Sequence, residues 1–216
     1  MDDFRAHSEN DATDKWPGLP PELLLRNWRN MPPVLKGLGV VLREVEAGDA
    51  GTLLALLSRD EIAQVIAPPP QSASELRTRI EAARVERLDG RGICFSVVPE
   101  RRSEPVGLFR VRELERGFGS AEWEFVLAPE HWGGGIFFAA APAVVDFAFD
   151  VLGVHRLEAR AAVHNGRGNG ALRKIGAVHE GVLRRSLQQE HGWVDQGLWT
   201  LIAADWRQRM GRSGVH

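Results

Sequence analysis

A glycine-rich turn joins a predicted strand to a long apolar helix in the middle of the chain. The strand spans Ala121 to Leu127, three glycines follow Trp132, and the helix is expected from about Gly135 to Leu152. In such a turn successive backbone N–H groups and the positive end of the helix dipole face one point, which is the geometry that binds an anion. Glycine also lets a phosphate approach the backbone without a Cβ in the way. A plain tight turn fits three glycines equally well, so the turn alone leaves both interpretations open.

Two better-known phosphate loops do not match this turn. A Walker loop needs Gly-Lys-Ser/Thr, which supplies the phosphate-binding lysine and the magnesium hydroxyl, and no such run follows here. The dinucleotide fingerprint needs G-x-G-x-x-G, and that spacing fails at Phe138.

The order of the expected elements predicts a mixed sheet covered by helices. Asp49 begins one helical pattern, and Ser72 or Ser74 can cap a second helix after the three prolines at 68–70. The long helix after the glycines contains Pro142, which predicts a kink. Seven apolar runs have the length and alternation of strands: 40–42, 93–98, 106–111, 121–127, 156–163, 182–187 and 197–203.

The N-terminal part differs in composition from the rest. Residues 1–14 are polar and acidic and are expected to be a disordered tail without a signal-peptide core. Residues 15–38 combine prolines with a Leu-rich patch, which indicates an extension with a short helix that packs on the domain or on a second subunit. Residues 39–207 are expected to form one domain.

Composition narrows the function classes. A formal net charge of -2 gives no basic field for nucleic acid or for an anionic membrane. The most apolar window carries Asp146 and Asp150, so a buried helix is favoured over a membrane span. The seven histidines show no metal-binding spacing, and we expect no metal. The single cysteine, Cys94, favours a reducing cytoplasm and a buried thiol.

Three segments in this order resemble the GNAT N-acetyltransferases, and most closely the RimJ/RimL-like branch that acetylates the amino termini of ribosomal proteins. Residues 122–127 followed by Trp132 to Ile136 are similar to the family's fourth strand and pyrophosphate loop. Asn165 followed by residues 172–176 is similar to its asparagine and next helix, and residues 180–184 with 195–201 to its closing hairpin. The resemblance runs from about Gly39 to Trp206.

The resemblance implies a three-layer α/β GNAT fold with a mixed, splayed sheet of six to seven strands flanked by helices. It also implies that the pantetheine arm of acetyl-CoA lies between the fourth and fifth strands. The cofactor-binding residues would then be Phe125, Val126 and Leu127 on the strand, the loop residues Trp132, Gly133, Gly134, Gly135, Ile136 and Phe137, and Asn165.

The sequence departs from the family pattern at several of these positions. The usual basic residue of the loop is Gly134, and the usual small residue at its end is Phe137, whose side chain must point away from the cofactor. The serine often found three residues after the asparagine is Gly168. The chain has no tyrosine, so a tyrosine general acid is excluded. A water molecule would take that role, or no acid would be needed.

Glu122 and Glu124 are the candidate catalytic residues. They are two apart on a strand, so both carboxylates project from one face, and either could act as the general base if burial raises its pKa. A salt bridge or an exposed strand face would explain them equally well. His131 and His164, near strand ends, have a suitable pKa but fit solvated loops better.

The sequence thus predicts transfer of an acetyl group from acetyl-CoA to a primary amine by direct attack. The acceptor, a protein N-terminus or a small-molecule amine, stays open, and a homodimer through the N-terminal extension is possible. The alternative is a non-catalytic acyl-CoA-binding or sensing module on the same scaffold.

Overall fold

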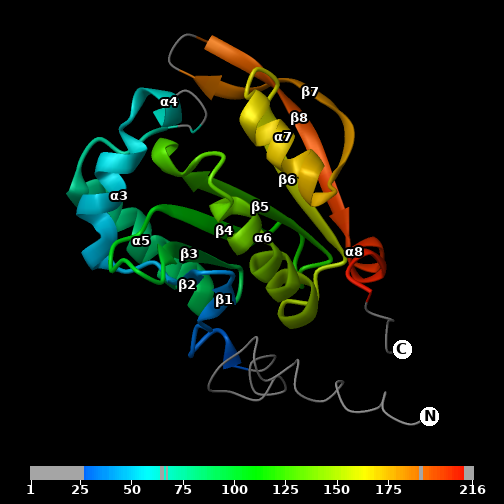
Figure 1. Cartoon of the computed structure of the whole chain (residues 1–216), viewed down its shortest axis with the longest axis horizontal. Helices are drawn as coiled ribbons and strands as arrows, with labels where there is room; N and C mark the ends of the chain where they lie inside the picture. The colour runs from blue at the N-terminus through cyan, green and yellow to red at the C-terminus, as the bar shows by residue number, and fades with distance from the viewer. Residues whose placement is uncertain (1–26, 64–65, 67, 190–191, 212–216) are drawn as a thin grey trace.

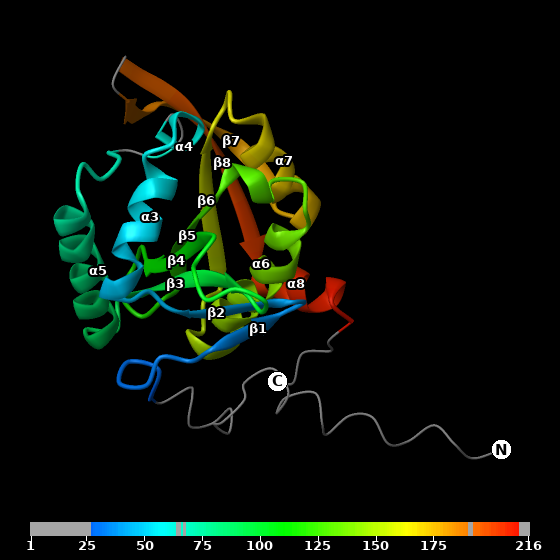
Figure 2. The same ribbon diagram turned by 60° about the vertical axis from the view of Figure 1, so that its left-hand side comes forward.

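The structure, a computed structural model, describes residues 27–63, 66, 68–189 and 192–211. These residues form three layers, with one sheet between two sets of helices (Figures 1 and 2). The tail predicted over residues 1–14 and the first half of the predicted extension, residues 15–26, lie outside the described residues.

The described residues form one sheet of eight strands in the order β1-β2-β3-β4-β5-β6-β8-β7. Neighbouring strands are antiparallel except β5 and β6, which run parallel. The strands are β1 (Leu35–Gly37), β2 (Val40–Glu44), β3 (Gly92–Pro99), β4 (Gly107–Glu113), β5 (Ser120–Leu127), β6 (Arg156–Ala162), β7 (Val178–Gln189) and β8 (Gly192–Ile202).

The strand beyond the predicted six to seven is β1. It has only three residues and pairs Leu35 with Leu42 of β2 across a short turn. Because β1 is so short and follows two prolines, its sequence does not show a strand pattern that distinguishes it from the rest of the predicted extension. Trp28, in the same segment, is buried and packs edge-on against Phe118 and Phe147, at ring-centroid distances of 6.1 and 6.4 Å.

One set of helices, α3 (Ala50–Leu57), α4 (Asp60–Ala63) and α5 (Ala73–Leu88), lies on one side of the sheet. The other set, α6 (Ile136–Asp146), α7 (Gly166–Ile175) and α8 (Ala203–Arg209), lies on the opposite side (Figure 2). The predicted cap of the second helix is confirmed, because the Ser72 hydroxyl accepts a hydrogen bond from Glu75 N at 3.1 Å.

The long helix after the glycines is less regular than predicted. Pro142 lies inside α6, which continues to Asp146. The chain then forms a π-helix over Phe147–Val151. The departure from α-helical geometry therefore comes five residues after the proline at which a kink was expected.

The two faces of the sheet have separate cores. The larger core lies under α6 and α7 and includes Phe95, Phe109, Trp123 and Phe147. The smaller core lies under α3 and α5 and includes Leu53 and other aliphatic side chains. Burial raises the pKa of the Cys94 thiol to about 12, so it stays protonated, as expected for an unreactive cysteine.

The sheet opens between β5 and β6. These strands pair at only three positions, from Ser120↔Arg156 to Glu122↔Glu158. β5 continues to Leu127 and β6 to Ala162, so the strands part beyond Glu122. The predicted splayed sheet is confirmed, and the opening is where the predicted site residues meet.

Within the described part of the chain, no helix is both long and apolar enough to cross a membrane.

Candidate active site

β5 presents a different chemistry on each of its faces. Trp123 and Phe125 point toward α6, whereas Val126 packs in the smaller core under α3 and α5. Because side chains alternate along a strand, Glu122 and Glu124 share the face of Val126. The predicted common face of the two carboxylates is therefore present, and it is the face opposite α6.

Aromatic rings hold β5 against the start of α6. The ring centroids of Phe125 and Phe137 are 4.6 Å apart, and Phe109 of β4 stacks against Trp123 at 5.9 Å and Phe137 at 6.0 Å. Such a cluster positions both elements firmly. The Phe137 side chain thus belongs to the core, as its place in the loop requires, and only its backbone N–H faces the turn.

Two glycines of the turn adopt a left-handed backbone conformation. A 3₁₀ turn (Pro129–His131) follows β5, and Gly133 and Gly135 then adopt φ values of 75° and 85°. These values are in the left-handed region, which side chains with a Cβ rarely adopt. A Cβ at either glycine would have no atom within 4 Å, so the space beside the loop is open.

The N-terminus of α6 faces this space without a side-chain cap. The first intrahelical bond runs from Ala139 N to Gly135 O at 2.9 Å. The N–H groups of residues 136–138 therefore have no partner within the helix. Predicted site residues Ile136 and Phe137 contribute two of these donors, which can bind an anion.

Trp132 holds the loop to the end of β5. Its Nε1 donates a hydrogen bond of 2.8 Å to the carbonyl oxygen of Leu127. The indole N–H is therefore occupied within the protein, and so is one of the predicted backbone acceptors on β5. The ring of Trp132 also lies under the Arg167 guanidinium, with Cζ 4.5 Å from the ring centroid.

Asn165 lies at the start of α7, across the opening from the glycine loop. Its Oδ1 accepts a hydrogen bond of 2.9 Å from Gly168 N and so caps the helix. The side-chain nitrogen takes no part in that cap and is the group that Asn165 can offer a ligand. Gly168 replaces the serine expected at this point, and its N–H is the donor in the cap.

Glu122 is buried and ion-paired. Its side chain is 4% exposed, Arg112 Nη2 of β4 donates to Oε2, and Arg160 Nε of β6 lies 3.5 Å from Oε1. Arg160 therefore bridges the two strands just where they part. Two guanidinium groups therefore occupy both oxygens of this buried carboxylate, which leaves little of it accessible to an acceptor amine.

Glu124 has a different environment. Its side chain is 55% exposed, and its ion pair in the described structure is a long one, to Arg110 Nη1 at 4.0 Å. That arginine makes shorter bonds, of 2.9 and 2.7 Å, to Glu86 of α5. Surrounding protein atoms, and secondly the charge of Glu122, raise the pKa of Glu124 above its ordinary value. Glu124 is thus the carboxylate that is both accessible and able to accept a proton.

The two histidines considered from the sequence lie at the rim. His131 ends the 3₁₀ turn before the loop, and His164 is exposed beyond the end of β6. Within the described residues, neither forms a hydrogen bond with Glu122 or Glu124. The described residues also contain no group of three or more His, Cys, Asp or Glu side chains placed to bind a metal ion.

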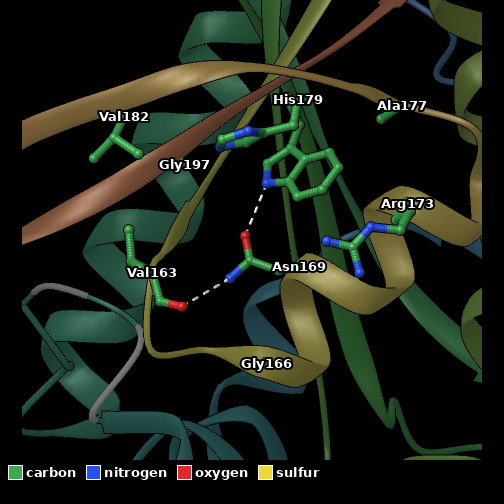
Figure 3. A pocket seen from close by; sticks show the side chains of 9 residues that line it. Val163, Gly166, Asn169, Arg173, Ala177, His179, Val182 and Gly197 are labelled. Atoms are coloured by element: carbon green, nitrogen blue, oxygen red, sulfur yellow. Dashed lines mark hydrogen bonds between the residues drawn. The ribbon is translucent and has the colours of Figure 1, made fainter.

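A separate cavity of about 510 Å³ lies between α7 and the β7–β8 pair (Figure 3). Trp199 is one of its lining residues, and the Nε1 of this tryptophan donates to Asn169 Oδ1 at 2.8 Å. Arg173 Cζ lies 5.5 Å from the Trp199 ring centroid, and His179 packs beside that ring. None of the predicted site residues lines this cavity, so it is distinct from the opening between β5 and β6.

Several residues around the opening were not predicted. Arg110, Arg112 and Arg160 partner the carboxylates, and Arg167 reaches Trp132. The strand register places Arg110 opposite Glu124 and Arg112 opposite Glu122. Arg110 and Arg112 are two residues apart, at the end of the predicted strand 106–111 and just after it. This spacing could have predicted their pairing with the two glutamates, because opposite charges pair across neighbouring strands.

The arrangement fits a cofactor with a phosphate end and an extended arm. The positive-φ glycines, the open space beside them and the uncapped helix suit the phosphates. From Trp123 to Leu127, β5 pairs with β4 on one edge, whereas its other edge, toward β6, pairs with no strand of the described residues. This open edge offers backbone groups to the arm. Glu122 and Glu124 lie next to this edge, on the face of the sheet opposite α6.

Comparison with known proteins agrees with this geometry. The profile of a family described as acetyltransferase (GNAT) domain matches residues 40–178. A relative from Bacillus subtilis (strain 168), named uncharacterized N-acetyltransferase YoaA, is 26% identical over 171 residues, which cover 79% of this chain and 97% of the relative.

Solved structures share the fold. Ribosomal-protein-S5-alanine acetyltransferase from Vibrio fischeri superimposes with a TM-score of 0.72 at 20% identity, covering 80% of this chain and 98% of that one. Mycobacterium smegmatis RimJ in complex with CoA-disulfide gives a TM-score of 0.67 at 24% identity, covering 80% of this chain and 90% of that one.

Proposed function

The chain belongs to the GNAT acetyltransferase family, and from this premise we propose that it acetylates the α-amine of a peptide or protein N-terminus by direct attack on acetyl-CoA. Acetyl-CoA-dependent N-acetyl transfer is the activity of the family. The acceptor and the roles of individual residues are the proposal. The observation that carries it is the contrast between Glu122, closed in by two arginines, and the accessible Glu124.

Glu124 is the proposed general base. An acceptor ammonium has no lone pair, so it must first lose a proton, and an α-amine with a pKa of about 8 needs less help than a lysine. Glu124 accepts that proton directly or through a water molecule. Its raised pKa makes it a stronger base than an ordinary glutamate.

The freed nitrogen then attacks the carbonyl carbon of the thioester, and a C–N bond forms while the carbonyl electrons move to oxygen. A backbone N–H on the open edge of β5 is the proposed donor to this oxyanion. Collapse breaks the C–S bond, the CoA thiolate leaves, and the nitrogen gives its second proton to a water molecule. The thiolate takes its proton from water, since the chain has no tyrosine to supply one.

The charges around the carboxylates favour an acceptor with one positive charge. Arg110, Arg112 and Arg160 line the same face as Glu122 and Glu124. A polyamine would meet these cations together with the carboxylates, whereas a peptide N-terminus brings a single ammonium and neutral amide groups. Two structures that share the fold are named for acetylation of ribosomal-protein alanine or as RimJ, in keeping with a protein acceptor.

Release of the CoA thiol tests the proposal. The full chain is mixed with acetyl-CoA and one of three acceptors: a short peptide with a free N-terminus and no lysine, the same peptide blocked at its N-terminus and carrying a lysine, or spermidine. We expect the free N-terminus to accelerate thiol release most. If only lysine or spermidine does so, the proposed acceptor is wrong, although the family assignment stands.

A further inference from the structure

The segment that forms the phosphate loop carries no fixed positive charge of its own. No lysine or arginine stands between Arg116 and Arg156, a stretch that includes all of β5, the glycine turn and α6. A helix N-terminus supplies only about half an elementary charge. A pyrophosphate carries a negative charge on each phosphate, so the loop by itself leaves much of that charge uncompensated.

One cation that reaches the loop from elsewhere is already engaged. Arg59, just before α4, forms an ion pair with Glu130 at 3.0 Å. Arg167, near the N-terminus of α7, is different. It is exposed, and no carboxylate of the described residues forms an ion pair with it.

Two contacts fix Arg167 beside the loop. The cap by Asn165 sets the start of α7, and the Arg167 guanidinium lies over the Trp132 ring at 4.5 Å. Trp132 is itself held by its hydrogen bond to Leu127 O. Stacking on an aromatic ring orients a guanidinium and leaves its N–H edge free to donate.

We propose that Arg167 supplies the missing charge by donating to the pyrophosphate of acetyl-CoA from across the opening. This inference rests on the proposed position of the pyrophosphate against residues 133–137. A guanidinium suits the task because its planar pair of N–H donors matches two phosphate oxygens. α7 would therefore close the phosphate site, although it lies more than thirty residues after the glycine turn.

Arg173 provides a matched control on the same helix. It also lies over a tryptophan, Trp199, with Cζ 5.5 Å from the ring centroid. That pair belongs to the separate cavity under β7 and β8 (Figure 3). Loss of either arginine removes one exposed charge from α7 and one stacking contact, but only Arg167 adjoins the glycine loop.

Calorimetric binding of CoA and of dephospho-CoA, which lacks the 3′-phosphate, tests the inference with the full chain. We expect Arg167→Ala to weaken both ligands by about 10- to 100-fold, the range for a lost charged hydrogen bond. Arg167→Lys should fall between wild type and alanine, and Arg173→Ala should bind like wild type.

Two results would overturn the inference. Unchanged CoA binding by Arg167→Ala would remove the residue from the site, and a loss restricted to CoA would place Arg167 on the 3′-phosphate instead. An equal loss in Arg173→Ala would show a general effect of charge on α7, which also contradicts the assignment. Because CoA binding needs no acceptor, failure of the amine panel above would leave this measurement intact.

Discussion

The two sides of the opening between β5 and β6 are built from different parts of the chain. The proposed cofactor side consists of backbone: the edge of β5 toward β6, the glycine turn and the first N–H groups of α6. The proposed acceptor side consists of side chains, two glutamates of β5 among arginines from two strands, β4 and β6. The backbone side depends on local conformation, whereas the side-chain side depends on strand register and on which charges are paired.

This difference leads to distinct effects of mutation on the two sides. Changes on the backbone side should alter cofactor affinity, and changes on the side-chain side should alter turnover or stability. On the side-chain side, mutations of Glu122 and of Glu124 should also differ in effect, because Glu122 is ion-paired and buried whereas Glu124 is accessible.

The largest expected effect is that of Glu124→Gln on turnover. Loss of a general base lowers kcat by about 10²- to 10⁴-fold, while the KM for acetyl-CoA should change little. In the wild type, kcat/KM should fall as the pH drops through the raised pKa of Glu124, because the protonated carboxyl cannot accept a proton. The variant should lose this acidic limb in a pH–rate profile.

Stability provides a control for this variant. A carboxyl whose pKa is raised on folding destabilises the native state once it is ionised, so Glu124→Gln should not lower the melting temperature at neutral pH. A variant that keeps wild-type turnover at all pH values would show that Glu124 is not the base.

The next effect is on the backbone side. Gly135→Val should weaken CoA binding by about 10- to 100-fold, because valine is strained at a φ of 85° and its side chain occupies the space beside the loop. Calorimetric titration with CoA measures the loss.

Gly117→Val is the matched control for strain. Gly117 has a φ of 84° and open space around it, but it lies in the turn between β4 and β5. Both valine variants should lose similar stability, and only Gly135→Val should lose affinity. Equal CoA binding by the two would mean that the turn does not contact the cofactor.

Glu122→Gln should act mainly on stability. Removing the charge leaves Arg112 without its partner and Arg160 with only the longer pair to Glu158 at 3.8 Å. The free energy of unfolding should fall by about 1–2 kcal/mol, less than for a fully buried pair because both arginines are over a third exposed. Urea unfolding measures this change. A fall in kcat as large as that of Glu124→Gln, at unchanged stability, would reverse the roles proposed for the two carboxylates.

The same contrast explains what the sequence could predict. The glycine turn and the alternation of Glu122 and Glu124 follow from local signals, namely a run of glycines and a period-two pattern. The splayed sheet was expected only from the resemblance to the GNAT family. The pairing of Glu122 with Arg160 depends on where β6 joins β5, and nothing within either strand specifies that register. The indole bond of Trp132 to Leu127 O and the position of Arg167 likewise arise only when distant elements pack.

Two features of the fold were hidden for other reasons. β1 has three residues, too few to show a strand period, and its pairing with β2 emerges only once the hairpin forms. The change from α-helix to π-helix at Phe147 follows a run of apolar residues whose pattern suits either helix.

The smallest effect lies at the closed end of the side-chain face, away from the opening. Arg156 binds Glu180 through two bonds of 2.7 and 2.6 Å, and Thr200 Oγ1 donates to the same carboxylate, so the pKa of Glu180 is lowered to about 2. A lowered pKa stabilises the fold above the ordinary pKa of glutamate, and this contribution is lost as the pH falls toward 2.

Glu180 is over a third exposed, so solvent screening limits the loss in Glu180→Gln to about 0.5–1 kcal/mol at pH 7. Urea unfolding at pH 7 and at pH 3 should show a smaller difference between variant and wild type at the lower pH, with kcat unchanged at pH 7. A loss of turnover would instead extend the functional face from the opening to β7.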